Sequence, residues 1–243
     1  MIDFAYPQAR KEKRIDLSGS STAAILCSRN VQVDECNTRV QEILATDDTP
    51  IHVLYSYDTK TERLDGEADM FSHKVLDTMN APDAPPHTLK VRVGDLVFLT
   101  RNYSMKAKLT NNSKHEIIQI DARRHVIIVR TLATSKFHVI HRINFHVEVK
   151  SKHRDVVNFT LLRRQFPLQL CYAMTIDKSQ GQTLHRVGLD LREHAFSHGQ
   201  VYVAYSRVME SKSILTLVEE ENRSLSDPDT FLTVNVVHKS LLL

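Results

Sequence analysis

The sequence contains no tryptophan, three cysteines and six glycines in 243 residues. Without tryptophan, any stacking on nucleic-acid bases has to use Phe, Tyr, His or Arg side chains. The three cysteines are odd in number and scattered, with no Cys-x-x-Cys pair. This usage fits a reducing compartment and argues against a disulfide framework and against structural zinc.

Other signals are missing as well. No run of eighteen apolar residues occurs, so we expect no membrane span, and the N-terminus does not read as a secretory signal. No glycine is followed by lysine, so the phosphate-binding loop Gly-x-x-x-x-Gly-Lys is absent. The pair Asp34-Glu35 lies on a helical stripe instead of a strand end, and we do not expect it to hold magnesium. The spacing of His185, His194 and His198 matches no ligand pattern, so no metal site is predicted.

The charge is distributed unevenly. Residues 89–163 hold fifteen Lys and Arg against five Asp and Glu, so the rest of the chain is acidic although the whole carries a formal net charge of +3. A basic block of this size indicates a polyanionic partner. The alternative to a polyanionic partner is a β-rich module whose basic side chains are only solvated.

Apolar periodicity predicts an α/β chain with a β-rich middle. Strands are expected at 22–27, 51–57, 168–174, 186–191 and 213–218, and helices at 30–44, 67–79 and 199–209. The proline-rich stretch 81–86 marks a junction. From residue 89 the period changes to two, and 94–100, 116–121, 126–131 and 137–149 are strand-like, with a hairpin turn at 121–125 and a further turn at 111–113.

The polar segment after the buried strand at 168–174 is the most informative one. It reads Ala173-Met-Thr-Ile-Asp-Lys-Ser-Gln-Gly-Gln-Thr183 and offers one cation, several hydroxyls and amides, and a glycine. A loop of this kind at the end of an α/β strand suits phosphate oxygens of a nucleotide or of a nucleic-acid strand. Downstream, His198-Gly-Gln-Val-Tyr-Val-Ala-Tyr-Ser-Arg-Val-Met209 predicts an amphipathic helix that carries Arg207.

Together these segments resemble motifs V and VI of the PIF family of DNA helicases, which belong to the 5′-to-3′ branch of helicase superfamily one. The departures are Asp177, where the family has Asn or His, and Tyr205. Residues 85–102 and 162–168 match as well, and 22–30 resemble motif IV more loosely. The resemblance covers most of residues 1–220.

The resemblance implies an α/β fold: a RecA-like second helicase domain, residues 1–88 and 164–243, with an inserted small basic β-barrel of the Src-homology-three type at 89–163. Arg207 would be the catalytic arginine finger, and ATP-binding residues would be Gly181, Gln182 and Arg29. The residues expected to contact DNA are Thr175, Lys178, Ser179 and Gln180 in the loop, and Lys106, Lys108 and Lys114 in the insertion. The carboxylate of Asp177 is repulsive near phosphates unless it is paired.

The implied function is that of a C-terminal lobe of an ATP-dependent 5′-to-3′ DNA helicase, of the kind used in DNA repair, recombination and telomere maintenance. ATP and Mg²⁺ would be cofactors of the complete helicase, and none would be bound tightly by this chain alone. The partners would be single-stranded DNA, duplex junctions and a first RecA-like ATPase lobe, with no membrane, in an intracellular setting that is nuclear or belongs to a virus or mobile element. The alternatives are a non-catalytic DNA-binding module and the remnant of a truncated helicase or mobile-element gene.

Overall fold

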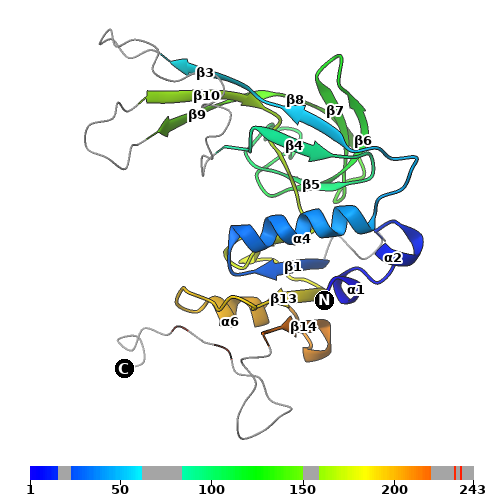
Figure 1. Ribbon diagram of the computed structural model, residues 1–243, viewed down its shortest axis with the longest axis vertical. Helices are drawn as coiled ribbons and strands as arrows, with labels where there is room; N and C mark the ends of the chain where they lie inside the picture. The colour runs from blue at the N-terminus through cyan, green and yellow to red at the C-terminus, as the bar shows by residue number, and fades with distance from the viewer. Residues whose placement is uncertain (16–22, 62–83, 150–158, 220–232, 234–235, 237–243) are drawn as a thin grey trace, which may run out of the picture. The chain divides into compact units, whose positions relative to one another are not determined.

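The computed structural model describes residues 1–15, 23–61, 84–149, 159–219, 233 and 236 (Figure 1). The chain divides into two compact units, which are considered separately. The first unit is Met1–Asp47 with Cys171–Leu243, and the second unit is Asp48–Leu170. No helix among the described residues is long and apolar enough to cross a membrane.

The first unit is built on a parallel sheet with the strand order β12-β1-β13-β14. Its strands are β1 (Ala23–Cys27), β12 (Ala173–Thr175), β13 (Arg186–Asp190) and β14 (Ile214–Leu217). Every residue of β1 is buried, as expected for a central parallel strand covered on both faces. The strands run in parallel, so the ends of β1, β12 and β13, where the polar segments begin, lie at the same sheet edge.

Helices pack on this sheet. The longest is α4 (Asn30–Ile43), which packs against β1 and β12 with Val33, Cys36 and Val40 buried. Alanine, leucine, methionine and valine side chains of the sheet form a core with Ile176, which follows β12, and with Ala204 of α6 (Gln200–Tyr205). The short elements are α1 (Ile2–Ala5), α2 (Ala9–Glu12), η1 (Asp177–Ser179) and η2 (Ser211–Ser213).

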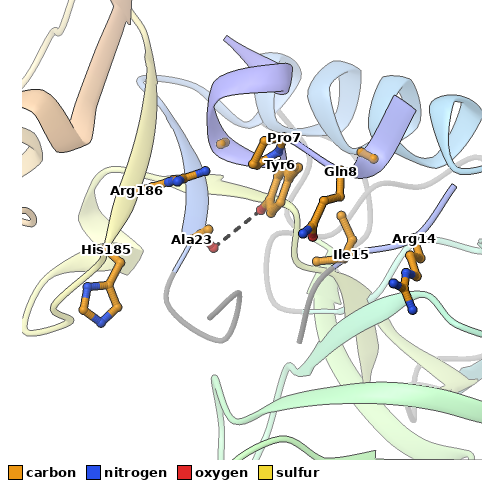
Figure 2. Close-up of a pocket in the computed structure, with 10 residues that line it drawn as sticks. Tyr6, Pro7, Gln8, Arg14, Ile15, Ala23, His185 and Arg186 are labelled. Atoms are coloured by element: carbon orange, nitrogen blue, oxygen red, sulfur yellow. Dashed lines mark hydrogen bonds between the residues drawn. The ribbon is translucent and has the colours of Figure 1, made fainter. Parts of the chain in front are cut away.

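A pocket of about 260 Å³ lies at the opposite edge of this sheet, where β1 and β13 begin (Figure 2). Ala23 and Arg186, the first residues of those strands, line it together with Tyr6, Arg14 and His185. The Tyr6 hydroxyl donates a 2.6 Å hydrogen bond to the carbonyl of Tyr172, and burial raises the pKa of Tyr6. The pocket is therefore separate from the polar segments at the other edge.

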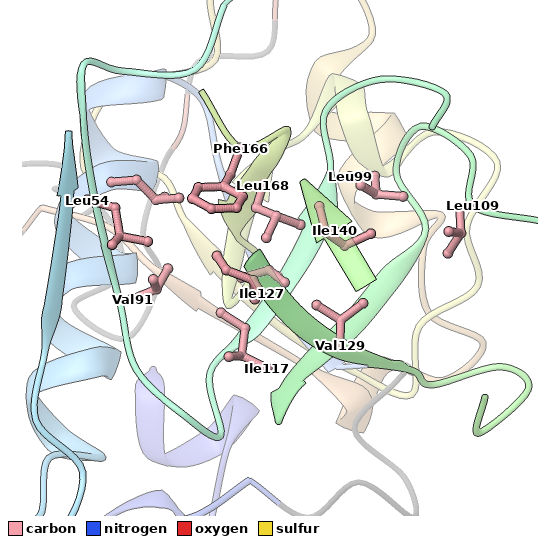
Figure 3. Packing of buried hydrophobic residues seen from close by; sticks show 12 residues of the cluster. Leu54, Val91, Leu99, Leu109, Ile117, Ile127, Val129, Ile140, Phe166 and Leu168 are labelled. Carbon is pink, nitrogen blue, oxygen red and sulfur yellow. The ribbon is translucent and has the colours of Figure 1, made fainter. Parts of the chain in front are cut away.

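The second unit consists of antiparallel strands. The described strands are β2 (His52–Tyr55), β3 (Tyr57–Thr61), β4 (Thr88–Val91), β5 (Leu96–Leu99), β6 (Lys114–Asp121), β7 (Val126–Thr131), β8 (Phe137–His141), β9 (Ile143–Val149), β10 (Phe159–Gln165) and β11 (Leu168–Leu170). They form the sheets β11-β5-β6-β7-β8, β3-β10-β9 and β2-β4. Leucine, isoleucine, valine and phenylalanine side chains from the five-stranded sheet and from β2 and β4 make one core (Figure 3).

The predicted α/β class with a β-rich middle is confirmed, and several boundaries differ. The expected strand at 51–57 is two strands that change partner at Ser56, and the expected strand at 137–149 is interrupted at Arg142. α6 ends at Tyr205, before Arg207, and the helix expected at 67–79 lies outside the described residues.

Pairing among the described strands does not close the five-stranded sheet into a barrel, so the barrel of the Src-homology-three type stays a prediction. The second unit extends beyond the predicted insertion of 89–163, because β2 and β3 pair with β4 and β10. The RecA-like lobe and the insertion boundaries also stay predictions.

Candidate functional site

The polar loop after β12 is closed by its own hydrogen bonds. The Ile176 amide donates to the carbonyl of Cys27 at the end of β1, which ties the loop to the central strand. The amide and the hydroxyl of Ser179 both donate to the Ile176 carbonyl, the hydroxyl at 2.6 Å, and Ser179 is buried. Gly181 follows with a φ of 78°, a backbone conformation that glycine adopts without strain.

Among the predicted loop residues, exposure differs. Lys178, Gln180 and Gly181 are exposed, Thr175 and Gln182 are half-buried, and Ser179 is fully buried. The Ser179 hydroxyl therefore supports the loop in this structure, and its predicted contact with DNA is untested.

Arg207 lies directly against this loop. Its Nη1 donates to the carbonyl oxygens of Gln182 at 3.0 Å and Ser179 at 3.4 Å, and its Nε donates to Val203 at 2.9 Å. Its Nη2 donates to the hydroxyl of Ser206 at 2.8 Å. All four partners are uncharged, so the positive charge of the guanidinium is solvated by dipoles and is not neutralised by a carboxylate among them.

A second link joins the same two segments. Gln200 at the start of α6 is buried, and its side-chain nitrogen lies 3.3 Å from a carboxylate oxygen of Asp177. The Gln200 side-chain oxygen accepts from the amides of Phe196 and Ser197, which fixes the orientation of the amide group. The carboxylate at the position where the PIF pattern has Asn or His is thus held by an amide donor.

Lys178 interacts electrostatically with Asp34 on α4. Burial lowers the pKa of the Lys178 ammonium, and the negative charge of Asp34 opposes this shift. Burial raises the pKa of Asp34 in turn, and Lys178 opposes that. Asp34, which we did not expect to hold magnesium, is therefore close enough to Lys178, a predicted DNA-binding residue, for the two charges to interact.

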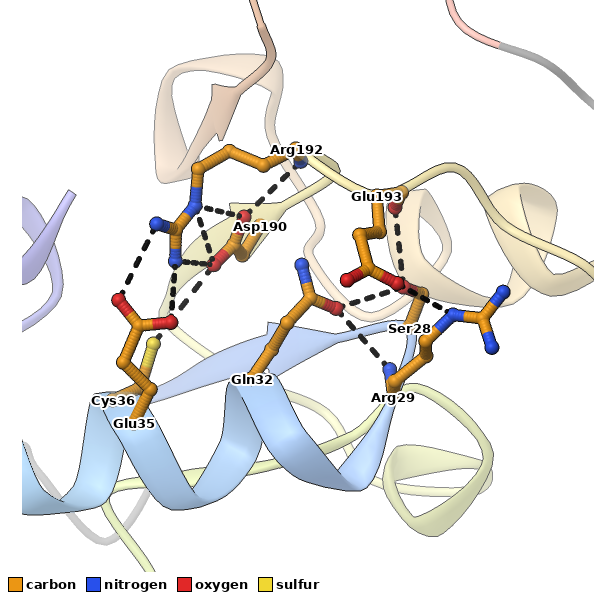
Figure 4. Close-up of polar contacts among 8 residues, drawn as sticks. All are labelled: Ser28, Arg29, Gln32, Glu35, Cys36, Asp190, Arg192 and Glu193. Atoms are coloured by element: carbon orange, nitrogen blue, oxygen red, sulfur yellow. Dashed lines mark hydrogen bonds and ion pairs between the residues drawn. The ribbon is translucent and has the colours of Figure 1, made fainter.

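Arg29, the other predicted nucleotide contact, has a charged partner. It lies two residues after β1, and its Nε is 2.6 Å from a carboxylate oxygen of Glu193 (Figure 4). Its guanidinium also lies over the Phe196 ring. Because the ion pair neutralises its charge, Arg29 offers less to a phosphate in this conformation than Arg207 does.

Sequence reasoning missed a buried cluster at this edge. Cys27, Cys36 and Asp190 have ligand-type atoms within 4.8 Å of one another. The register of β1 and β13 pairs Cys27 with Asp190, so a correct strand alignment would have revealed the cluster. Hydrogen bonding with Cys36 and burial raise the pKa of the Cys27 thiol.

The carboxylate of this cluster is already engaged. Arg192 donates from Nη2 to an Asp190 oxygen at 2.7 Å and from Nε at 3.0 Å, and this contact raises the pKa of Arg192 (Figure 4). We therefore describe the cluster as a buried ion pair beside two thiols, and the prediction of no metal site is untested.

The three lysines expected to form one DNA-binding loop lie on different elements. Lys106 and Lys108 are exposed in a tight turn between Ser104 and Leu109, whereas Lys114 is half-buried at the start of β6. The turn at 111–113 is confirmed, with Asn112 at a φ of 63°. β6 begins at Lys114, earlier than the strand predicted at 116–121, and the predicted DNA contact of the three lysines is untested.

Comparisons with known proteins point in one direction. No protein-family model matches the sequence. The human ATP-dependent DNA helicase PIF1 is 27% identical over 180 residues, which cover 74% of this chain and 26% of the human protein. The ATP-dependent DNA helicase RRM3 of Saccharomyces cerevisiae is 48% identical over 60 residues, which cover 25% of this chain and 8% of that protein. The chain thus spans about a quarter of the human relative's length.

Solved structures give the same result for the fold. A Bacteroides Pif1 helicase in complex with ADP-AlF3 and single-stranded DNA has a TM-score of 0.63 at 20% identity, covering 99% of this chain and 48% of that one. The Pif1 helicase of Candida albicans has a TM-score of 0.56 at 24% identity, covering 80% and 45%. The resemblance to the PIF family of DNA helicases that the motifs predicted is confirmed, as a match to part of the length of those proteins.

Proposed function

We propose that this chain acts as the C-terminal lobe of an ATP-dependent 5′-to-3′ DNA helicase. In this role the polar loop after β12 contacts single-stranded DNA, and Arg207 acts as the arginine finger. Residues 1–88 and 164–243 would form the RecA-like domain, and residues 89–163 the inserted barrel. The partners would be a first ATPase lobe and DNA junctions, inside the cell.

The observation that carries this proposal is the set of hydrogen bonds made by Arg207. The guanidinium has no carboxylate partner among the described residues, and it donates to main-chain carbonyls of the loop that carries Lys178. A charge held only by dipoles is available to the phosphoryl oxygens of a nucleotide, where an arginine stabilises developing negative charge. A movement of Arg207 toward a nucleotide would break its hydrogen bonds to Ser179 and Gln182. Nucleotide binding would thereby affect the loop that carries the DNA-binding residue Lys178.

The residues present fit a nucleotide and its Mg²⁺ only in part. Arg207, Gly181 and Gln182 offer a cation and main-chain groups to phosphates, whereas the phosphate-binding loop and the Mg²⁺ ligands would come from the first lobe. The complete helicase would use ATP with Mg²⁺ as its energy source. This chain would supply charge stabilisation through Arg207 and contacts with the DNA strand through the loop after β12.

Two variants separate these roles. Lys178→Ala should weaken binding of single-stranded DNA, because it removes a backbone contact. Arg207→Ala should leave that affinity largely unchanged and should abolish the DNA-stimulated ATP hydrolysis that appears when a PIF-type first lobe is added. An arginine finger contributes about 10³–10⁵ in rate, so the loss should be unmistakable.

The same assays can refute the proposal. ATP hydrolysis by the unmixed chain that disappears in Arg207→Ala would show that the active site is not divided between two lobes. Single-stranded DNA binding without any stimulated hydrolysis in the mixture would favour the non-catalytic DNA-binding module instead.

A further inference from the structure

The sheet β3-β10-β9 has one buried face and one exposed face. Asp58, Arg163 and Phe145 point to the buried face. The register places Tyr57 opposite Arg164, and Arg164 opposite Asn144, so these residues form one row across the other face. Arg164 and Asn144 are exposed, and Tyr57 is 65% exposed. We call this surface, with the adjoining Arg142 and His146, the Tyr57–Arg164 face.

A buried polar network fixes the backbone beneath this face. Arg163 pairs with Asp58 through bonds of 2.7 to 3.1 Å, and the Ser56 hydroxyl donates to Asp58 at 2.6 Å. Because side chains alternate along a strand, holding Ser56 and Asp58 inward turns Tyr55 and Tyr57 outward. Tyr55 is 57% exposed, so two tyrosines stand on the surface at the corner between β2 and β3.

The charges on this face are unusual. Neither Arg142 nor Arg164 has an ion pair with any carboxylate in the part of the chain that the structure describes. Nε of Arg142 is buried without a hydrogen-bond partner, and its guanidinium stands 5.3 Å from the ring centre of Phe166. The pKa of Arg142 is lowered by burial and by the positive charge of Arg164, so the two guanidinium groups are close enough to repel each other.

Two neighbouring arginines that repel each other are stabilised by a shared polyanion. Arg guanidinium groups bind phosphate oxygens through paired hydrogen bonds, and successive phosphates of a strand supply one charge each. The three residues that the register places in one row, Tyr57, Arg164 and Asn144, include no acidic side chain. The row of Tyr57, Arg164 and Asn144 is therefore cationic and aromatic.

An exposed tyrosine beside paired arginines fits unpaired bases better than it fits a duplex. Every base has a π-face that can stack on an aromatic ring, and in a duplex that face is covered by the neighbouring bases. A contact with duplex phosphates would use the arginines and leave the Tyr57 ring without a function.

We propose that the Tyr57–Arg164 face is a binding surface for single-stranded DNA, on which Arg164 and Arg142 hold neighbouring phosphates and Tyr57 stacks on a base. This inference rests on the proposed function and adds to it a contact with single-stranded DNA on the second unit. It differs from the sequence-based expectation, which assigned DNA contact in this part of the chain to Lys106, Lys108 and Lys114.

The test measures binding of a labelled oligothymidylate of about 20 nucleotides, longer than the about 4–16 nucleotides that one small β module covers. Tyr57→Ala should weaken binding by about five- to hundredfold, and Tyr57→Phe should bind like the unmodified chain, because one stacked base contributes on that scale. Phe137→Ala is the matched control, since Phe137 is an equally exposed aromatic residue on β8. It should not change the affinity.

Arg164→Gln tests the phosphate contact independently. It should reduce the slope of log affinity against log salt by about 0.7, the value for one phosphate of a single strand. Arg123→Gln removes the same charge from an exposed hairpin turn and should leave the slope unchanged. With a blunt duplex, Tyr57→Ala should bind like the unmodified chain.

These experiments distinguish a failure of the binding surface proposed here from a failure of the proposed function. If the unmodified chain does not bind single-stranded DNA, both proposals are overturned. If it binds, and neither Tyr57→Ala nor Arg164→Gln differs from its control, only the surface proposed here is wrong. An equal loss of duplex and single-strand binding in Tyr57→Ala would overturn the stacking contact.

Discussion

Replacing Arg163 by methionine should destabilise the second unit more than any exposed substitution on the same strand. Arg163 is fully buried, and its guanidinium makes three hydrogen bonds to Asp58 and one of 3.1 Å to the carbonyl of Pro85. Methionine fills much of the same volume and removes all four hydrogen bonds. It leaves a buried carboxylate whose remaining partners among the described residues are Ser56 and His87.

The magnitude follows from that uncompensated charge. Breaking a buried ion pair by removing one partner costs about 3–5 kcal/mol, well above the typical cost of a point mutation. The expected free-energy loss for Arg163→Met is therefore about 3–5 kcal/mol. Arg164→Met on the neighbouring exposed position should change stability by no more than about 0.5 kcal/mol.

Urea unfolding followed by circular dichroism measures both variants. Hydrogen exchange in peptides from β3, β9 and β10 then shows whether the loss is confined to the second unit. A double variant Asp58→Asn with Arg163→Met should recover part of the loss, because the unpaired charge is gone. If Arg163→Met costs no more than Arg164→Met, the buried ion pair is not what holds β3 against β10.

Three further outcomes are expected. Burial lowers the pKa of His115 from 6.5 to about 4, so the unfolded chain takes up the proton first; stability is complete above pH 6.5, falls as the pH drops toward 4 by up to about 3 kcal/mol, and should fall less in His115→Gln, as pH-dependent unfolding would show. Native protein should leave a thiol reagent almost unreacted until a denaturant exposes all three cysteines, and rapid reaction of the native chain would contradict their burial. Gly181→Ala should cost about 1–2 kcal/mol in thermal unfolding through backbone strain alone, since nothing lies within 4 Å of the added carbon, and an unchanged stability would show that the loop rearranges.

Local features were predictable because they depend on neighbours in the sequence. The buried strand β1 and the apolar stripe of α4 follow from composition and period. The turn at 121–125 and the positive φ of Asn112 follow from turn chemistry. Each is decided within a few residues, so one sequence is enough to find it.

Features that depend on register were not predictable. Asp58 and Arg163 are 105 residues apart, and alternation on β3 and β10 does not say which residues meet. Arg163 accordingly contributes to the basic charge of residues 89–163 in the sequence, although in the structure it is buried and paired with Asp58. The same reason explains why the proximity of Cys27 and Asp190 was not predicted, since it follows from the register of β1 and β13.

For binding of a polyanion, the positions of the surplus positive charges matter more than the net charge of the basic segment. Within the basic segment Asp95, Glu116 and Asp121 each have an arginine partner, and those partners are Arg92, Arg130 and Arg124. Arg163 is neutralised by Asp58 from outside the segment. The negative charges of these partners partly offset the arginine charges, so these arginines attract a polyanion less strongly than cations without a carboxylate partner do. Arg142 and, one position beyond the segment, Arg164 differ from the exposed turn with Lys106 and Lys108, because Arg164 lies opposite the exposed Tyr57. The whole basic segment would attract DNA from a distance. The row of Tyr57, Arg164 and Asn144 would determine where a single strand binds.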